Sequence, residues 1–536
     1  MPDGQRTAHA PRTPHVVVVG AGIGGLVSAL LLASRGLRVS VLEAAAAPGG
    51  KMRQLQVGGQ PIDSGPTVLT MRWILESSFR LAGAELHEHV ALSPLQVLAR
   101  HAWSGEAADQ LDLYADRRRS TDAIGRFAGA AEARRFEAFC DEARAVYRTL
   151  EGPYIRSAKP SVPGMVAALG PRGLAQLTAL GPLSTLASLL SRRFENPRLQ
   201  QLFGRYATYC GASPWLAPAT LLLVAQVEMD GVWTVAGGMH ALARAVAALA
   251  VQRGASFSYG ATVGEILVAQ GRASGVRLAD GRVIEADAVV FNGDADALAQ
   301  GLLGAEVQGS VPLRRPADRS LSALTASVLA RCSGFPLTRH NVFFQPDYAA
   351  EFDDILQGGR LPQRGTVYVC AQDRGDDAAD PGRPERLLLL VNAPPNGDRV
   401  PADPLEIQTC EQTSLALMRR CGLHLELASA PAASTWLRTT PQDFSRLFPG
   451  SGGGLYGTAT QGWMALFRRP GSTTRLPGLV LAGGSVHPGP GVPMAAMSGV
   501  RAAETVLAHL GSTSRYRVAG TSGGMSTPSA TTAGTG

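Results

Sequence analysis

The first hydrophobic pattern in the chain is that of a compact strand–helix–strand unit. His15–Val19 is a β-branched run typical of a buried strand, and Gly20–Gly25 is predicted to be a turn. Apolar residues then recur at helical spacing until Gly36, after which residues 39–42 form a second strand that ends in Glu43. This order predicts a βαβ unit.

The next part of the chain, from about residue 72 to residue 205, has a helical and charged pattern. Residues 126–148 are predicted to form one amphipathic helix, whereas proline and glycine divide residues 164–194 into short apolar helices. The second of these short helices is expected to present three leucines on one face: Leu183, Leu186 and Leu190. That face can lie on a membrane or cover the core of a domain, and periodicity alone does not separate the two.

A second α/β section is predicted to begin near Gly237, and a third near residue 479. The expected elements are a helix at 239–253, strands at 255–259 and 262–269, a hairpin at 275–285, a buried strand at 288–292, a strand at 479–482 and a helix from about 493 to 510. The last two dozen residues are mainly serine, threonine and glycine, which predicts a disordered tail.

Composition limits the class of protein. A chain of 536 residues predicts two or three lobes, and a mean hydropathy of +0.05 fits a soluble or peripherally membrane-bound protein. The uncharged runs at 16–34 and 174–191 are interrupted by glycine or proline, so neither is expected to span a bilayer. The first fourteen residues are polar, which argues against a signal peptide.

The net charge of +7 is carried almost entirely by arginine, since Lys51 and Lys159 are the only lysines. The arginines are scattered without interleaved aromatic residues, which argues against nucleic-acid binding. No two of the six cysteines form a C-x-x-C motif, so neither a zinc nor an iron–sulfur site is expected, and free thiols fit a cytoplasmic location.

The Gly20-x-Gly22-x-x-Gly25 motif after the first strand predicts dinucleotide binding. Gly20 permits a tight turn, Gly22 lets a diphosphate approach the backbone, and Gly25 lets the helix pack against the strand. Glu43, at the end of the second strand, is placed to accept hydrogen bonds from ribose hydroxyls. The loop residues expected to contact the cofactor are Gly20, Ala21, Gly22, Ile23, Gly24 and Gly25.

The residues after Glu43 distinguish FAD from NAD. The chain continues to Gly49-Gly50-Lys51, and this resembles flavoproteins of the amine-oxidase and phytoene-desaturase superfamily, in which a Gly-Gly-Arg/Lys turn clasps the diphosphate. The resemblance implies that Gly50 and Lys51 contact FAD; the alternative is a surface turn with a solvated lysine.

The resemblance extends through two further blocks. Residues 62–67 are similar to the Asp-x-Gly-Pro-Thr segment under the flavin ring of the desaturases, which implies cofactor contacts for Pro66 and Thr67. Asp63 can bond buried backbone as a turn cap or take part in proton transfer. Gly237-Gly238-Met239 is similar to the start of the returning half-domain, in which Val263 would touch the adenine, and Asn292-Gly-Asp294 ends this block.

The most specific block runs from residue 479 to residue 494 and resembles the closing signature of the carotenoid desaturases. Its helix would direct its N-terminus at the pyrimidine edge of the flavin. The cofactor contacts implied here are Gly484, Ser485, Gly491, Val492, Pro493 and Met494. Many relatives have an acidic residue where this chain has Gly484-Ser485, so backbone N–H groups and the serine hydroxyl would replace it. His487 would either orient the substrate or flavin, or bond loop backbone.

Together these blocks predict an α/β protein with a Rossmann-like FAD-binding domain of the glutathione reductase or amine oxidase type and a discontinuous α+β substrate domain. The expected FAD-binding domain comprises residues 12–70, 226–300 and 471–511. The expected substrate and membrane-associating domain comprises residues 71–225 and 301–470, and residues 512–536 form the tail.

The resemblance implies a carotenoid desaturase with non-covalent FAD, most similar to the bacterial 1-hydroxycarotenoid 3,4-desaturases, peripheral on the inner face of the membrane. It would introduce a C3–C4 double bond into acyclic 1-hydroxycarotenoids, with quinone or oxygen as electron acceptor. Candidates for the catalytic base are Asp63, Asp230 and His487. Alternatives are a phytoene or neurosporene desaturase, a carotenoid isomerase and, less favoured because the flavin motifs are largely intact, a non-enzymatic prenyl-lipid escort. An amine oxidase is disfavoured because no tyrosine pair suits an amine cage.

Overall fold

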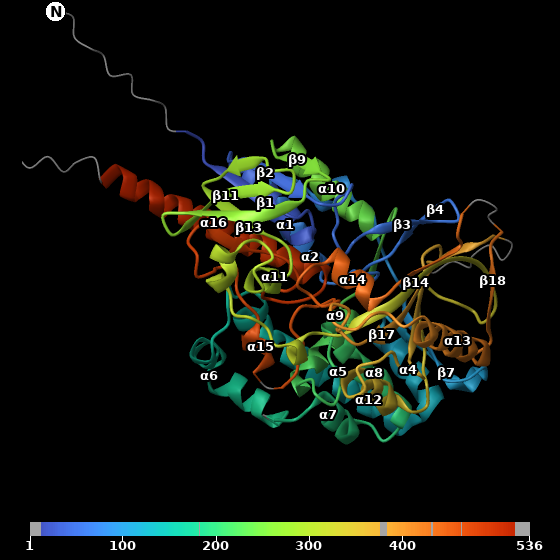
Figure 1. The fold of residues 1–536 in the computed structure, drawn as a ribbon. Helices are drawn as coiled ribbons and strands as arrows, with labels where there is room; N and C mark the ends of the chain where they lie inside the picture. Colours follow the sequence, from blue (N-terminus) through green and yellow to red (C-terminus); the bar gives the residue numbers. More distant parts are fainter. Residues whose placement is uncertain (1–11, 182, 376–382, 430–432, 463, 520–536) are drawn as a thin grey trace, which may run out of the picture.

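The computed structural model describes residues 12–181, 183–375, 383–429, 433–462 and 464–519, and its N-terminal part contains the predicted βαβ unit (Figure 1). β1 (His15–Val19) is buried throughout, and β2 (Arg38–Glu43) runs parallel to it. Between them, α1 (Ile23–Ala33) has no solvent-facing residue, which explains why its sequence has no polar stripe.

β1 lies at the centre of a five-stranded parallel sheet whose order in the described residues is β20-β13-β1-β2-β9. Its other strands are β9 (Ser256–Tyr259), β13 (Ala288–Phe291) and β20 (Leu479–Leu481). α1, α10 (Met239–Gln252) and α16 (Val492–Ala519) share one core cluster on one face. The antiparallel strands β10 (Val263–Ala269), β11 (Arg272–Leu278) and β12 (Val283–Glu285) share the core of the other face. The predicted Rossmann-like architecture is confirmed.

The second half of the molecule is built on a large mixed sheet, to the right and below in Figure 1. Its order in the described residues is β18-β14-β17-β16-β15-β6-β7, with β19 paired to β14. The strands are β6 (Val97–Ala102), β7 (Gln110–Tyr114), β14 (Ser322–Gly334), β15 (His340–Phe343), β16 (Val367–Ala371), β17 (Glu385–Ala393), β18 (Leu423–Leu427) and β19 (Trp436–Thr439).

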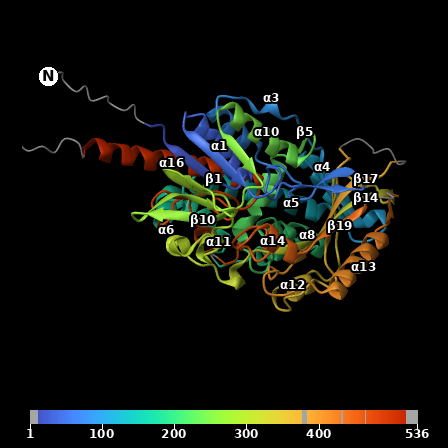
Figure 2. The same ribbon diagram turned by 45° about the horizontal axis from the view of Figure 1, so that its top comes forward.

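Helices pack against both faces of this sheet, as the rotated view also shows (Figure 2). On one side are α4 (Arg117–Ala128), α5 (Ala130–Leu150), α6 (Val162–Ala179), α7 (Leu186–Arg193), α8 (Pro197–Gly204) and α9 (Leu223–Met229). The others are α12 (Tyr348–Leu356), α13 (Pro404–Arg420), α14 (Pro441–Leu447) and α15 (Ala465–Arg468). Buried leucine and phenylalanine dominate the core between the sheet and α5, α7 and α8.

Short elements connect the two halves, and some cross the expected boundary at residue 70. β3 (Gln54–Val57) and β4 (Gln60–Asp63) form a hairpin that packs on Leu329 of the large sheet. α2 (Arg72–Leu81) joins the core of the Rossmann-like half instead, through buried residues such as Phe79. The remaining short elements are α3 (Leu86–His89), β5 (Leu92–Pro94), β8 (Trp233–Val235) and α11 (Ala295–Ala299).

Two predicted helical segments differ from the structure. The expected helix at 126–148 is two helices, α4 and α5, because the chain turns at Gly129, whose φ of 94° is favoured only by glycine. At the C-terminus α16 continues to Ala519, so residues 512–519 of the expected disordered tail are helical. The rest of that segment, 520–536, lies outside the described residues.

Two alternatives were open for the leucine face at residues 183–190, and the structure supports packing in a domain core for two of its three leucines. Leu186 and Leu190 of α7 are buried in the core of the substrate half, whereas Leu183, before the helix starts, is 79% exposed. α6 is the exposed apolar helix instead; Met165 is its buried residue, and Val162 and Val166 face solvent. Over the part of the chain that is described, no helix combines the length and hydropathy that a bilayer span needs.

Candidate flavin-binding site

The glycine loop between β1 and α1 has the tight packing expected of a phosphate-binding turn. Gly20 has a φ of 96°, and a Cβ at Gly25 would lie 2.2 Å from the Gly20 carbonyl oxygen, so α1 can approach β1 only with glycine here. A Cβ at Gly24 would lie 2.7 Å from the Gly483 amide nitrogen. The N-terminus of α1 therefore lies directly beside the C-terminal loop, with free N–H groups suited to an anion.

Glu43 is fixed at the end of β2 by backbone hydrogen bonds. Its carboxylate accepts from the amide of Ala21 at 2.6 Å and from the amide of Ala45 at 2.8 Å. Each oxygen retains a lone pair, so the group can still accept from ribose hydroxyls. The Glu43 carbonyl also accepts from Ala261, which places the start of β10, with Val263, beside this carboxylate.

The Gly49–Lys51 turn lies against the glycine loop. The Gly49 amide donates to the Ala21 carbonyl at 2.8 Å, and a Cβ at Gly50 would come within 3.2 Å of the Gly22 Cα. Lys51 is partly buried, and its ammonium donates to the Leu455 carbonyl at 2.6 Å. Burial lowers the pKa of Lys51 to about 8.

Asp63 connects the hairpin to α10. One carboxylate oxygen accepts from the Met239 amide at the start of that helix, and the other accepts from the Gln54 side chain at 3.2 Å. A Cβ at Gly238 would collide with the carboxylate, since it would lie 2.1 Å from Oδ2. These contacts are those of a buried turn cap, and burial raises the pKa of Asp63. They also explain why the 62–67 and 237–239 blocks meet.

The C-terminal loop and the start of α16 lie beside the first glycine loop, and His487 of this loop packs against Tyr154. His487 is 1% exposed, and its Nε2 donates to the Tyr154 carbonyl at 3.0 Å while the two rings meet edge to face. Nδ1 is buried without a hydrogen-bond partner. Burial lowers the pKa of His487 to about 4, so the ring is neutral at physiological pH and Nδ1 is an acceptor. α16 begins at Val492, immediately followed by Pro493 and Met494.

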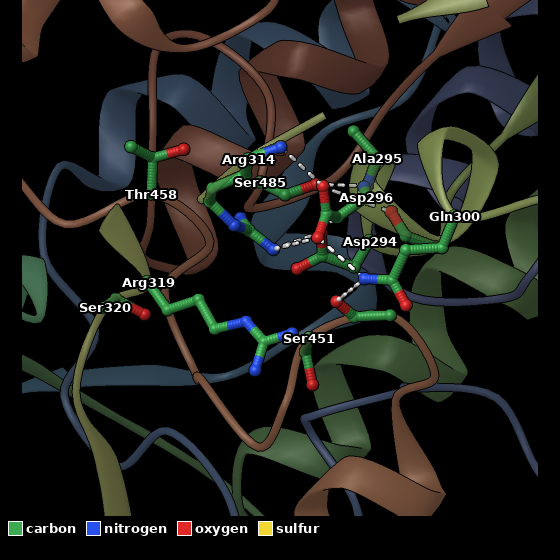
Figure 3. Close-up of polar contacts among 12 residues, drawn as sticks. Asp294, Ala295, Asp296, Gln300, Arg314, Arg319, Ser320, Ser451, Thr458 and Ser485 are labelled. Carbon is green, nitrogen blue, oxygen red and sulfur yellow. Dashed lines mark hydrogen bonds and ion pairs between the residues drawn. The ribbon is translucent and has the colours of Figure 1, made fainter. Parts of the chain in front are cut away.

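A polar network joins this loop to the Asn292-Gly-Asp294 block (Figure 3). The Ser485 hydroxyl accepts from the Ala295 amide at 3.1 Å, so in this structure it braces the loop. Arg314 pairs with Asp294 at 2.9 Å. Burial alone would raise the pKa of Asp294, but Arg314 and Lys51 together hold it below its usual value. Asp294 is therefore the carboxylate whose negative charge interacts with both Arg314 and Lys51.

One candidate site residue lies apart from the candidate flavin site, and one residue of the site was not predicted from the sequence. Asp230 is exposed at the end of α9 and accepts from the Gln226 side chain at 2.5 Å. Arg469 was not predicted, yet its buried guanidinium donates to the carbonyl oxygens of Tyr456, Thr458 and Gly484. No motif marks it, because its partners are carbonyl groups of distant loops.

The arrangement fits FAD. Glycines fill the positions where a Cβ would obstruct the backbone of the loop, and a fixed carboxylate stands at the end of β2. Partly buried Lys51 and buried Arg469 donate to carbonyl groups, so the surroundings suit an added anion such as a diphosphate. Residues of both chain ends and of the 237–294 section form one surface around these groups.

A parallel sheet with a dinucleotide loop, an acidic strand end and a C-terminal helix that begins beside that loop are the features of a flavoprotein of the two-domain oxidoreductase class. The family model "Flavin containing amine oxidoreductase" matches residues 23–507, and the chain belongs to that family. Its cofactor is thus a flavin, FAD.

Two curated relatives and one solved structure illustrate the similarity. A "Hydroxyneurosporene desaturase" of Rubrivivax gelatinosus is 62% identical over 98% of this chain and 99% of its own length. A protein of the same name from Cereibacter sphaeroides is 45% identical over 94% of this chain and 99% of its own. The cyclohexylamine oxidase of Brevibacterium oxydans superposes with a TM-score of 0.53 at 18% identity, covering 94% of this chain and all of that one, which shows a shared fold.

Proposed function

We propose that this chain is an FAD-dependent carotenoid desaturase that introduces the C3–C4 double bond into acyclic 1-hydroxycarotenoids. One observation carries the proposal: 62% identity, maintained over nearly the whole length of both chains, to a hydroxyneurosporene desaturase. The intact glycine loop, Glu43 and C-terminal helix supply what an oxidoreductase of this kind needs to hold its flavin. The enzyme belongs to carotenoid biosynthesis.

The reaction removes two hydrogens from adjacent carbons, one as a hydride and the other as a proton. Bound flavin supplies the hydride acceptor. The protein binds the diphosphate at α1 and the ribose at Glu43, and the start of α16 favours negative charge at the pyrimidine edge. The aromatic and leucine core between the large sheet and α5 excludes water from the substrate half.

The proton acceptor is proposed from the geometry of the three candidates. His487 has a buried, neutral imidazole with a free Nδ1 lone pair, in the same loop as the start of α16. Asp63 has both carboxylate oxygens engaged, and Asp230 faces solvent. Of the three, His487 is the group best placed to hold a proton or to orient the polyene.

Binding to a membrane surface follows from the substrate, because a carotenoid is insoluble in water and must be taken from a bilayer. The exposed apolar residues of α6, together with Leu183, are the proposed contact with the inner face of the membrane. Non-covalent attachment of FAD, and a quinone or oxygen as electron acceptor, complete the proposal.

Purified protein incubated with defined carotenoids tests the function. The protein should release intact FAD on acid denaturation, and an acyclic 1-hydroxycarotenoid should gain one double bond at C3–C4. If only phytoene or neurosporene is converted, the protein is a phytoene or neurosporene desaturase instead. A change of cis/trans geometry without loss of hydrogen would make it an isomerase, and an inert colourless protein that binds prenyl lipids would make it an escort.

A further inference from the structure

A buried arginine in the apolar half of the molecule lacks the partners that such a group normally has. Arg205 follows α8 and is 6% exposed, and its sequence neighbours Phe203 and Tyr206 belong to the core of the substrate half. Its Nε and Nη1 atoms are buried without any hydrogen-bond partner. Because burial of an unpaired guanidinium is strongly unfavourable, its retention points to a partner that arrives with a ligand.

Two buried carboxylates, Glu228 and Glu351, interact electrostatically with Arg205, and both are hydrogen-bonded to other donors. Glu228 accepts from the hydroxyls of Tyr206 and Tyr209, the latter at 3.2 Å. Glu351 accepts from the Thr366 amide at 2.9 Å and from the Asn392 side chain at 2.8 Å. Burial raises the pKa of Glu228 and of Glu351, which favours their uncharged forms. Among the described residues, none of the ion pairs involves Arg205.

Arg205 is linked to the flavin side of the molecule through one tyrosine. Its Cζ lies 5.8 Å from the centroid of the Tyr368 ring. The Tyr368 hydroxyl is 2.7 Å from the Thr67 hydroxyl and 2.7 Å from His340 Nδ1. Thr67 belongs to the segment proposed to run beneath the flavin ring, so the guanidinium lies on the substrate side of that segment.

Two further groups of this cluster are unpartnered. His340 Nε2 and the Tyr348 hydroxyl are both buried without hydrogen bonds. Burial lowers the pKa of His340 to about 3, so this ring is neutral, and it adds no second positive charge. A cluster with one guanidinium, one neutral imidazole and one phenol suits a small, uncharged oxygen function with both acceptor and donor capacity.

We propose that Arg205 donates a hydrogen bond to the oxygen at C1 of the carotenoid and so selects hydroxylated over hydrocarbon substrates. This inference rests on the proposed function, in which the reacting C3–C4 bond begins two carbons from that oxygen. A substrate whose C3 faces the flavin must then place its C1 oxygen close to the ring, on the side where Thr67, Tyr368 and Arg205 follow one another. Arg205 is thus a specificity residue, and the remaining polyene lies in the apolar core.

The test compares two ligands on four forms of the holoprotein. The ligands are an acyclic 1-hydroxycarotenoid and the hydrocarbon that lacks its hydroxyl, and the proteins are the wild type, Arg205→Met, Arg205→Lys and Arg193→Met. Arg193, at the end of α7, is paired with Glu142 of α5 at 2.7 Å and serves as the matched control. Dissociation constants are measured by the change in flavin absorbance on titration, and kcat and KM are measured beside them.

Arg205→Met should weaken binding of the hydroxylated ligand about 10- to 100-fold, as expected for loss of a hydrogen bond to a charged donor, while the hydrocarbon binds as before. Arg205→Lys should recover part of the difference, and Arg193→Met should match the wild type. Equal losses for both ligands, or no loss for either, would overturn the proposal.

Melting temperature and flavin content separate a folding defect from a specificity effect. If Arg205→Met does not fold, the affinities of the wild type and of Arg205→Lys for the two ligands still test the proposal. A wild type that binds both ligands equally contradicts it. The proposed function fails by a different result, namely that wild-type protein desaturates neither ligand at C3–C4, and hydroxyl-dependent binding can be scored in that case as well.

Discussion

Charged residues around the proposed flavin site are held largely by backbone groups. Glu43 bonds two amides, Lys51 bonds a carbonyl, and Arg469 bonds three carbonyls. Backbone partners fix a side chain without neutralising it, so the charges remain available to a ligand. Asp294 is the exception, since it is paired with Arg314.

Replacement of Glu43 should weaken FAD binding without unfolding the protein. Glu43→Ala removes the ribose acceptor and leaves the Ala21 and Ala45 amides without theirs, at a cost of about 1–3 kcal/mol, or roughly 10- to 100-fold in affinity. Flavin retained after dialysis is the measurement. Glu43→Gln should retain an amount of flavin between those of the wild type and Glu43→Ala. Glu285 is an exposed acidic residue on β12, and Glu285→Ala is the control. Full retention by Glu43→Ala would remove Glu43 from the site.

The acid sensitivity of the protein should depend partly on His487. Its pKa is about 4 in the folded protein and about 6.5 when unfolded, so the folded state favours the neutral ring. The contribution of the neutral His487 ring to the free energy of unfolding is fully present above pH 6.5. It is lost as the pH falls toward 4, and the loss is at most about 3 kcal/mol. Urea unfolding between pH 4.5 and 7.5 should show a smaller pH dependence for His487→Gln than for the wild type. Identical pH dependence in both proteins would contradict this.

At the scale of elements, α6 and α7 both carry apolar side chains but lie in opposite environments. α7 buries its leucines against α5 and α8, whereas α6 exposes its valines and alanines and projects from the body of the molecule (Figure 1). An apolar helix with an exposed face is suited to an interface between water and lipid.

Serine at the three exposed positions, Val162, Val166 and Leu183, should reduce sedimentation with anionic vesicles while FAD content and melting temperature stay unchanged. Leu190→Ser, in the core, should instead lower stability by roughly 2–5 kcal/mol. Vesicle binding by the triple variant equal to that of the wild type would show that another surface meets the membrane.

The elements that sequence predicted well depend on local rules. β1 was placed at its observed limits, because a buried β-branched run followed by a glycine turn defines this strand within a few residues. The break at Gly129 was missed, since glycine within a helical pattern can be tolerated or can end the helix. Leu186 and Leu190 show the same limit, because helical spacing identifies an apolar face without identifying what packs on it.

The motifs predicted which segments of the chain lie together, whereas contacts that only tertiary structure assembles were missed. Gly20–Gly25, Glu43 and the C-terminal loop lie together as their motifs indicated. Arg469 and Arg205 have no motif, and their surroundings come from loops and strands far away in sequence. Burial of an unpaired charge is visible only once the chain has folded.

At the scale of the whole molecule, the flavin site joins the two ends of the chain to its middle. β1 and α1 come from the first segment, β13 from the second, and β20 with α16 from the last. A ligand held by all three segments stabilises their association, so FAD should act as a tertiary link.

FAD added to apoprotein at about 100 times its dissociation constant should stabilise the fold by about 2.7 kcal/mol. Hydrogen exchange should slow together in residues 15–43, 288–294 and 479–497, and it should change little in β16 and β17. Protection restricted to the first of these segments would show that the C-terminal loop does not close on the cofactor.

The scarcity of lysine makes covalent labelling a direct report on the cofactor site. Besides the terminal amine, Lys51 and Lys159 are the only targets for an amine-directed reagent. Lys159 is exposed and reacts in every state, whereas Lys51 is partly buried and its ammonium donates to the Leu455 carbonyl beside the proposed flavin site. With a pKa of about 8, Lys51 is also half deprotonated, and therefore nucleophilic, under mild conditions. One additional mass increment in the intact protein thus counts the molecules whose flavin site has opened.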